Sequence, residues 1–366
     1  MPATNVFLRI DHAARWLPRS RSFRARRYGD SVDTQISLPR PCGPAARRSM
    51  STSPKKSVPA SAPPQRVGAM LGALGFLSRK TPYFRGKWRV TGFIFERWLA
   101  RSRKQQVIRL ARGMRINCKL WDEVQNAIWW NGANYERKES KFIRRYLKPG
   151  MVFFDVGSNV GYYTLLAAPI VGQGGKVHAF EPVSEQHADL RANIERNQLQ
   201  NVVPERLIVT DRAGTMEINL GAEDNGGTGS VALVYRADRP TERVDCTTLD
   251  AYLREHGVTR LDVLKIDVEG HEPFVLRGMA ETLRTLRPLL LVEVRGEMLE
   301  EVGSSRETLF AQIAAHGYFP YALTRGGWPR PMRVPADGNL IVFSPDDRLH
   351  EKHRPFAKLR RKKKAD

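Results

Sequence analysis

From about residue 136 onward, the hydrophobic positions of this chain alternate between two patterns: short continuous runs and helical spacing. Short apolar runs, typical of buried strands, recur there, and the first opens the segment 152–163. The others lie at 176–180, 202–209, 261–266, 289–294, 318–323 and 339–343. Segments with apolar residues three and four positions apart separate the strands and predict helices. These helices cover 136–147, 184–197, 249–256, 273–286 and 305–316.

Repeated strand–helix units predict an α/β fold, in which a doubly wound, mostly parallel sheet lies between layers of helices. Three further β-like pieces interrupt the alternation, and a flexible glycine-rich stretch at 221–229 separates the first of them from the rest. They lie at 215–220, 230–235 and 242–247.

The first strand runs into a turn of the pattern Asp155-x-Gly157-x-Asn159-x-Gly161, and a helix follows. The next strand ends on Glu181. Glycines allow a tight turn and a close approach of the backbone to a ligand, and the later acid can accept both ribose hydroxyls. This layout predicts a nucleoside-binding βαβ unit, with a purely structural turn as the alternative.

Charge indicates which nucleoside fits this turn. A dinucleotide site needs a third glycine and a helix N-terminus that is free to hold a pyrophosphate. Here the third glycine is missing, and Asp155 would repel phosphate. A carboxylate suits a ligand with a positive amino group and a positive sulfonium. The sequence therefore favours S-adenosyl-L-methionine (AdoMet) as the cofactor.

Carboxylates close nearly every predicted strand. Because ligands of such sheets bind beyond the carboxyl ends of the strands, these residues form the inventory of candidate functional groups. Besides the glycine turn and Glu181, it contains Asp211, Asp267, Glu269, His271, Glu272 and Glu293. Asp211 taken alone has the properties of a helix cap or a surface charge, but together the acids indicate a site for a cationic cofactor.

The net charge of +22 is unevenly spread along the 366 residues. Residues 151–345 carry 19 basic and 26 acidic side chains, whereas all flanking segments are basic. We therefore divide the chain into a disordered basic leader, a basic helical cap that is rich in aromatic residues, the sheet domain and a basic tail. Their bounds are 1–66, 67–148, 149–345 and 346–366. An over-extended gene start, with Met50 or Met70 as initiator, is the alternative explanation of the leader.

The cap interleaves tryptophans and other aromatics with Arg and Lys over 80–150. Packing of a cap onto the sheet domain is the favoured interpretation, and a stacking face for an acidic polymer is the alternative. The basic tails could also contact anionic surfaces peripherally.

Cysteine usage and hydropathy bear on the compartment. The three cysteines lie far apart, which supports neither a disulfide framework nor a zinc site and fits a reducing environment. No apolar run approaches the roughly 20 residues that a transmembrane helix needs. We expect a cytoplasmic protein without a transmembrane segment.

Several motifs, taken together, resemble those of the FkbM-type methyltransferases. The similar segments are 150–164, 179–182, 211–212, 248–250, 264–272 and 290–293, and the resemblance covers roughly 110–345. It implies a class I AdoMet-dependent, Rossmann-like fold with a seven-stranded sheet whose last strand is antiparallel. It also implies methylation of a hydroxyl on a sugar, glycolipid or secondary metabolite. Ser158 stands where the family commonly has alanine.

The resemblance also implies roles for individual residues. The methionine part of AdoMet would be surrounded by Asp155, Gly157, Ser158, Asn159 and Gly161. Glu181 would bind the ribose hydroxyls, and Asp211 would lie near the adenine. Asp267 would sit beside the point of methyl transfer. Glu136, just upstream of the domain, could fold over the cofactor.

Methyl transfer to a hydroxyl needs alignment of the reactants and a base that removes the proton. Asp267, Glu269 and His271 are the candidate catalytic residues. A divalent metal ion held by Asp267, Glu293 and a neighbouring acid is an alternative, but no spacing demands it, so none is predicted. The favoured partner is a small-molecule or glycan acceptor. A nucleic-acid methyltransferase and a non-catalytic nucleoside-binding scaffold are the alternative hypotheses.

Overall fold

The computed structural model describes residues 65–66, 68–81, 86–99, 102–220, 240–347 and 349–352. Its main feature is an eight-stranded sheet with the order β13-β12-β14-β11-β10-β4-β5-β6. The strands that come first along the chain are β4 (Val152–Val156), β5 (Lys176–Phe180) and β6 (Val202–Glu205). The other half consists of β10 (Val263–Ile266), β11 (Leu289–Val294), β12 (Phe319–Leu323), β13 (Pro329–Pro331) and β14 (Gly338–Ser344).

Alternating side chains divide the core between the two faces of this sheet, as the period of two in a strand requires. Phe153 of β4 packs with one buried cluster and Phe154 with the other. The first cluster is covered by α5 (Arg137–Tyr146), α6 (Tyr162–Val171) and α7 (Ser184–Arg196). The second is covered by α8 (Leu249–Glu255), α9 (Glu272–Arg277), α10 (Ala280–Thr285), α11 (Gly296–Glu301) and α12 (Arg306–Ala314). The predicted doubly wound α/β fold is confirmed.

The direction of the last strand is also as expected. Strands β4, β5, β6, β10 and β11 are mutually parallel, whereas β14 runs antiparallel to β11. The seven predicted strands are present, and β13 extends the sheet by forming an antiparallel pair with β12.

Two predicted elements are broken in the structure. The run 202–209 divides into β6 and β7 (Ile208–Val209), because β7 leaves the main sheet and pairs with β9 (Thr241–Thr247). With β8 (Gly214–Asn219), these strands form a separate sheet of order β7-β9-β8. The helix 273–286 breaks at Gly278, where an added Cβ would lie 1.9 Å from the Thr210 carbonyl oxygen. The predicted strand at 230–235 lies outside the described residues.

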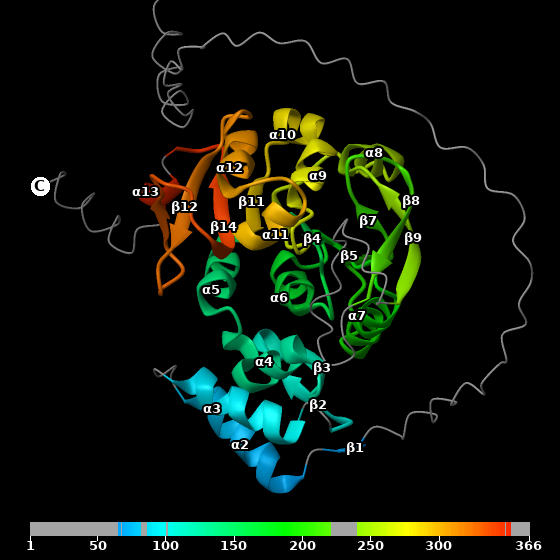
Figure 1. Cartoon of the computed structure of the whole chain (residues 1–366), viewed down its shortest axis with the longest axis vertical. Coiled ribbons are helices and arrows are strands. Elements are labelled where there is room, and N and C mark those ends of the chain that lie inside the picture. The colour runs from blue at the N-terminus through cyan, green and yellow to red at the C-terminus, as the bar shows by residue number, and fades with distance from the viewer. Residues whose placement is uncertain are drawn as a thin grey trace, which may run out of the picture.

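The cap segment contains helices and, unlike the expectation, a small sheet. Its helices are α2 (Ala69–Lys80), α3 (Lys87–Ile94), the π-helix η2 (Phe95–Leu99) and α4 (Glu123–Asn131). Short 3₁₀ turns lie at η3 (Ala111–Gly113) and η4 (Gly132–Asn134). Its strands, in the order β1-β2-β3, are β1 (Gln65–Arg66), β2 (Lys104–Arg109) and β3 (Arg115–Lys119). Helices α2 and α3 lie at one end of the molecule, and α4 separates them from the main sheet (Figure 1).

The disorder predicted for 1–66 and for most of 346–366 falls on residues outside the described ranges, apart from short pieces such as α13 (Leu349–Lys352). Within the ranges that are described, no helix has the length and apolar character needed to cross a bilayer.

Candidate active site

A cavity opens beyond the carboxyl ends of β4, β5, β10 and β11, where parallel sheets of this kind bind ligands. Among the residues singled out from the sequence, Gly157, Ser158, Asn159, Glu181, Asp267 and Glu269 line it. The fold therefore brings the glycine turn, the acid after β5 and two acids after β10 into one place.

A buried lysine connects the strands beneath the cavity. The Nζ atom of Lys265 lies 3.2 Å from an oxygen of Asp155 and 3.3 Å from an oxygen of Asp267, and it donates a 2.8 Å hydrogen bond to the Gly157 carbonyl. Burial opposes the charge of Lys265, but the nearby Asp267 and Asp155 carboxylates outweigh it and raise its pKa. Lys265 thus fixes the glycine turn against the end of β10.

Asp155 lies below the cavity instead of lining it. Its side chain is fully buried, accepts a 2.7 Å hydrogen bond from Thr164 Oγ1 and pairs with Lys265. Burial raises the pKa of Asp155, and the Lys265 charge opposes this shift. We therefore expect Asp155 to act on a ligand through Lys265 and the turn, not by direct contact.

Gly157 allows an unusually close approach of two chain segments. Its φ of +76° lies in the left-handed region, and a Cβ at this position would sit 1.8 Å from the Asp267 carbonyl oxygen. Only glycine can occupy such a point without displacing backbone. The glycine of this turn is therefore required for contact with β10 as well as for access to a ligand.

Glu181 is held by the backbone of the glycine turn. Its two carboxylate oxygens accept hydrogen bonds from the Asn159 amide at 2.7 Å and from the Val183 amide at 3.0 Å. Burial raises the pKa of Glu181 to about 7, and the two amides oppose that shift. Next to it, the buried Ser158 Oγ has no hydrogen-bond partner among the described residues. The turn therefore presents both an oriented carboxylate and an unused hydroxyl.

Glu136 and three tyrosines also line the cavity. Glu136 precedes α5 in a left-handed conformation with φ of +41° and accepts a hydrogen bond from the Tyr163 hydroxyl. Burial, followed by the Asp267 charge, raises the pKa of Glu136 to about 7. The tyrosines of the lining are Tyr135, Tyr162 and Tyr163. Glu136 therefore belongs to the cavity, and its placement over the cofactor stays a prediction.

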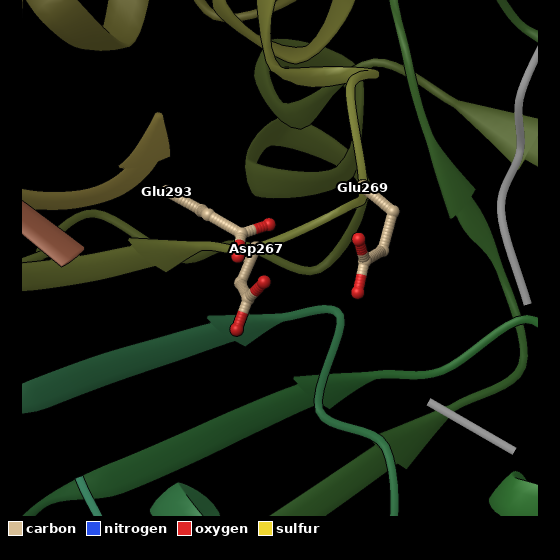
Figure 2. A group of neighbouring side chains, drawn as sticks. All are labelled: Asp267, Glu269 and Glu293. Atoms are coloured by element: carbon tan, nitrogen blue, oxygen red, sulfur yellow. The ribbon is translucent and has the colours of Figure 1, made fainter. Parts of the chain in front are cut away.

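Three carboxylates gather at the ends of β10 and β11. Asp267, Glu269 and Glu293 have oxygens that all lie within 4.8 Å of one another (Figure 2). Arg295 pairs with Glu293 at 2.9 Å and approaches Glu269 at 3.9 Å. Burial, and then the neighbouring carboxylates, raise the pKa of both glutamates. These three acids could hold a divalent cation, although no spacing in the sequence demands one.

Gly161 and Asp211 do not line the cavity. Gly161 begins α6 with φ of +91° and packs on Leu190, so its role is structural. Asp211 follows β7, which belongs to the second sheet, and both Nε and Nη2 of Arg277 donate hydrogen bonds to it.

His271 is buried and does not face the three carboxylates. Its Nε2 lies 2.9 Å from Thr210 Oγ1, and its ring stacks on Phe274 at 4.5 Å. Burial lowers the pKa of His271 to about 4. The ring touches only a smaller, separate cavity that also includes Gly157. This position does not suit the base that the sequence suggested.

Lys265 and Arg295 were missed by sequence reasoning, whereas Glu293 was noted as an acid at a strand end and as a possible metal ligand. The sequence does contain a signal for Lys265. A lysine inside a short apolar strand is buried, and a buried charge needs a charged partner. Its partner follows from the register, which places Lys265 beside Asp155.

The strand order, with parallel strands on both sides of β4 and a final antiparallel β14, defines the class of this domain. It is the class I AdoMet-dependent methyltransferase fold, and its cavity lies at the ligand-binding edge of that fold.

Comparison with known proteins relates this domain to one family. Residues 155–320 match the model of the methyltransferase FkbM domain. The chain is 31% identical over 162 residues to 31-O-demethyl-FK506 methyltransferase FkbM of Streptomyces tacrolimicus, covering 37% of this chain and 62% of that protein. It is 29% identical over 143 residues to hexuronic acid methyltransferase AglP of Haloferax volcanii, covering 39% and 55%. The chain thus spans between half and two thirds of these relatives.

Among solved structures, the chain is similar to methyltransferase FkbM from Methylobacillus flagellatus, with 13% identity and a TM-score of 0.36 over 60% of this chain and 53% of that one. It is also similar to an O-methyltransferase from Thermotoga maritima, with 16% identity and a TM-score of 0.33 over 65% and 76%.

Proposed function

We propose that the cavity binds AdoMet and that the protein transfers the methyl group to a hydroxyl oxygen of a small-molecule or glycan acceptor. The observation that carries this proposal is the cradle formed by Gly157, Ser158 and Glu181. It combines a close backbone approach, an unused buried hydroxyl and a carboxylate oriented by two amides.

The cradle fits the polar groups of AdoMet. The carboxylate of Glu181 retains lone pairs after accepting two amide hydrogens, so it can accept hydrogen bonds from a ribose diol. Ser158 Oγ can bond to the amino-acid part of the ligand. The acids of the lining favour a ligand with positive groups.

Bound AdoMet supplies a methyl group on a positive sulfur, which leaves as a neutral thioether. The chain's own contribution is to align the acceptor and to receive its proton. Asp267 is 27% exposed and held by Lys265 at 3.3 Å, so it is placed to accept a hydrogen bond from the acceptor hydroxyl.

Glu269 is the better base of the two acids. It lines the cavity, and burial, followed by the Asp267 charge, raises the pKa of Glu269 to about 7. A carboxylate with that pKa is available at neutral pH and basic enough to take a proton as the oxygen attacks. We propose that Glu269 removes the proton while Asp267 positions the hydroxyl.

The class of acceptor follows from the lining and from the relatives. A phosphodiester would add negative charge to a cavity lined by Glu136, Glu181, Asp267, Glu269 and Glu293, with Lys265 and Arg295 as the opposing cations. This disfavours nucleic acid. The names of the two curated relatives give 31-O-demethyl-FK506 and a hexuronic acid as what they methylate. We propose a hydroxyl on a sugar, a glycolipid or a secondary metabolite.

Calorimetric titration of AdoMet, and separately of S-adenosylhomocysteine, into the full chain tests the cofactor. Glu181→Gln should weaken binding at least tenfold, equivalent to about 1.4 kcal/mol, because an amide cannot accept from two backbone N–H groups and a diol. Glu300→Gln on the exposed face of α11 is the matched control and should bind normally. Folded protein that releases no heat with either ligand would sink the proposal.

Transfer itself is measured with AdoMet that carries an isotope-labelled methyl group and a panel of hydroxylated sugars and uronic acids. Label recovered as a methyl ether supports O-methylation. Tight AdoMet binding without transfer to any member of a broad panel would favour the scaffold hypothesis.

A further inference from the structure

The outer surface of the cap carries a concentration of exposed apolar side chains. We define the cap face as Met70, Leu74 and Leu77 of α2, Val90 and Phe93 of α3, and Trp98 of η2. Met70 is 77%, Phe93 64% and Trp98 61% exposed. The other large apolar side chains that are exposed within the described ranges are Phe76, also on α2, and the isolated Val107 and Val334. Isolated exposed apolar residues are ordinary, but a group of them on adjoining helices is not.

Helix α2 is oriented in the opposite way to an ordinary surface helix. Its inner side uses polar groups: Ser78 Oγ donates to the Trp130 carbonyl at 3.0 Å, and Arg79 donates to the Trp129 carbonyl at 2.7 Å. Gly75 lies so close to Trp129 that an added Cβ would come within 2.5 Å of the ring. A solvent-facing helix normally points its apolar stripe inward. Here the stripe points outward, and these contacts fix it there.

The stripe is regular and is joined to the next helix. Met70, Leu74 and Leu77 are four and three residues apart, so they line one side of α2. The buried Lys87 of α3 donates from Nζ to the Ser78 carbonyl at 2.8 Å, which attaches α3 to α2. The helices that carry the cap face are therefore joined to one another and to α4 by hydrogen bonds.

The same helices are strongly basic. Lys80, Arg89 and Arg97 are exposed, and Lys80 Nζ lies 5.7 Å from the Phe76 ring centre. In the sequence from 69 to 99, Glu96 is the single acidic residue. An apolar surface with basic residues needs a partner that is both apolar and negatively charged.

Charge separates the candidate partners. The leader 1–66 carries 13 Lys and Arg against 3 acids, and a second copy of the cap would present the same basic helices, so both would be repelled. A nucleic acid would match the charge but would leave the aliphatic side chains of α2 exposed to water. An anionic lipid surface satisfies both requirements, since basic residues meet the headgroups while apolar ones enter the acyl boundary.

We propose that the cap face docks on the surface of a membrane that contains anionic lipids. Its apolar side chains insert at the headgroup boundary, and Lys80, Arg89 and Arg97 lie against the lipid phosphates. Because α2 packs on α4, and Val124 and Ile128 of α4 line the cavity, one helix layer separates the docked face from the candidate active site. The proposal concerns binding and does not rest on methyl transfer.

The test is co-sedimentation of the full chain with vesicles of phosphatidylcholine, alone or mixed with phosphatidylglycerol. We expect binding to the mixed vesicles only. Phe93→Ser with Trp98→Ser should lower the partition coefficient at least tenfold. Val334→Ser, 71% exposed but outside the cap face, is the matched control and should change it less than twofold. Lys80→Gln and Arg97→Gln should each lower it roughly fivefold, and added salt should weaken binding further.

Three results would overturn the proposal. Absence of binding to mixed vesicles is the first. In the second, the chain is a dimer that Phe93→Ser with Trp98→Ser converts to a monomer, which assigns the face to a second copy. In the third, the basic substitutions abolish binding but the apolar pair does not, and single-stranded RNA competes, which assigns the face to nucleic acid. AdoMet titration of each variant verifies that the cavity is intact. Loss of vesicle binding therefore does not count against the proposed AdoMet site.

Discussion

Replacing Gly157 by alanine should abolish AdoMet binding and destabilise the domain. The new Cβ would lie 1.8 Å from the Asp267 carbonyl oxygen, whereas real Cβ atoms essentially never come within 3.0 Å of such a neighbour. The two segments must separate by about 1 Å or more. That movement disturbs the bond from the Asp267 amide to the Val156 carbonyl at 3.1 Å and the bond from Lys265 to the Gly157 carbonyl.

The magnitude can be divided into two parts. Alanine in a left-handed conformation costs roughly 1–2 kcal/mol. Overpacking of backbone that cannot rotate away adds about 1–3 kcal/mol. The free energy of unfolding should therefore fall by about 2–5 kcal/mol, and the cradle for the ligand should open at the same time.

Gly257, at the end of α8, provides the matched control, because its φ is +61° but a Cβ there would meet nothing within 4 Å. Gly257→Ala should incur the conformational cost alone, about 1–2 kcal/mol, and leave AdoMet affinity unchanged. Urea unfolding and calorimetric titration measure both quantities. The reasoning fails if Gly157→Ala binds AdoMet normally and loses no more stability than Gly257→Ala.

Three further predictions concern charged groups. Lys265→Met leaves Asp155 buried without its cation and should lower the free energy of unfolding by about 3–5 kcal/mol in urea titrations; Asp155→Asn in the same chain should restore part of this, and exposed Lys176→Met should cost little. Because Glu269 must be ionised to act as a base, the transfer rate should rise with pH up to about 7 and then level off; a profile that keeps this limb in Glu269→Gln would contradict its role. Burial raises the pKa of Glu272 to about 7, so its contribution to stability is complete below its ordinary pKa of 4.5 and is lost as pH rises through 7; thermal melts of Glu272→Gln should show a flatter pH dependence.

The sequence predicted the parts of the site that depend on local pattern. Short apolar runs located the strands, and the residue type that follows each strand identified Glu181, Asp267 and Glu269 as neighbours. This works because parallel strands in one sheet end at the same edge. The glycines of the turn were equally readable, since a left-handed φ strongly restricts residue choice.

The rest depended on which strands share a sheet. Asp211 follows a strand, yet β7 pairs with β9 in the second sheet, so Asp211 lies at a different edge. Lys265 gains its meaning only from the register that sets it beside Asp155. Neither the sheet to which a two-residue strand belongs nor the register of two distant strands can be derived from periodicity within one segment.

The aromatic residues of the cap show the same limit in another form. Packing and binding were alternative interpretations of one basic, aromatic segment, and the structure divides the residues between them. Trp129 and Trp130 are buried, while Phe93 and Trp98 are exposed. The buried pair lies against the inner side of α2, where polar groups bond to the carbonyls of both tryptophans, whereas Phe93 and Trp98 belong to α3 and η2. The composition of the segment treats these aromatic residues alike, because it does not show which of them pack against α2. An outward apolar stripe of this kind is therefore a property of the folded cap, and it is the reason to seek a partner there.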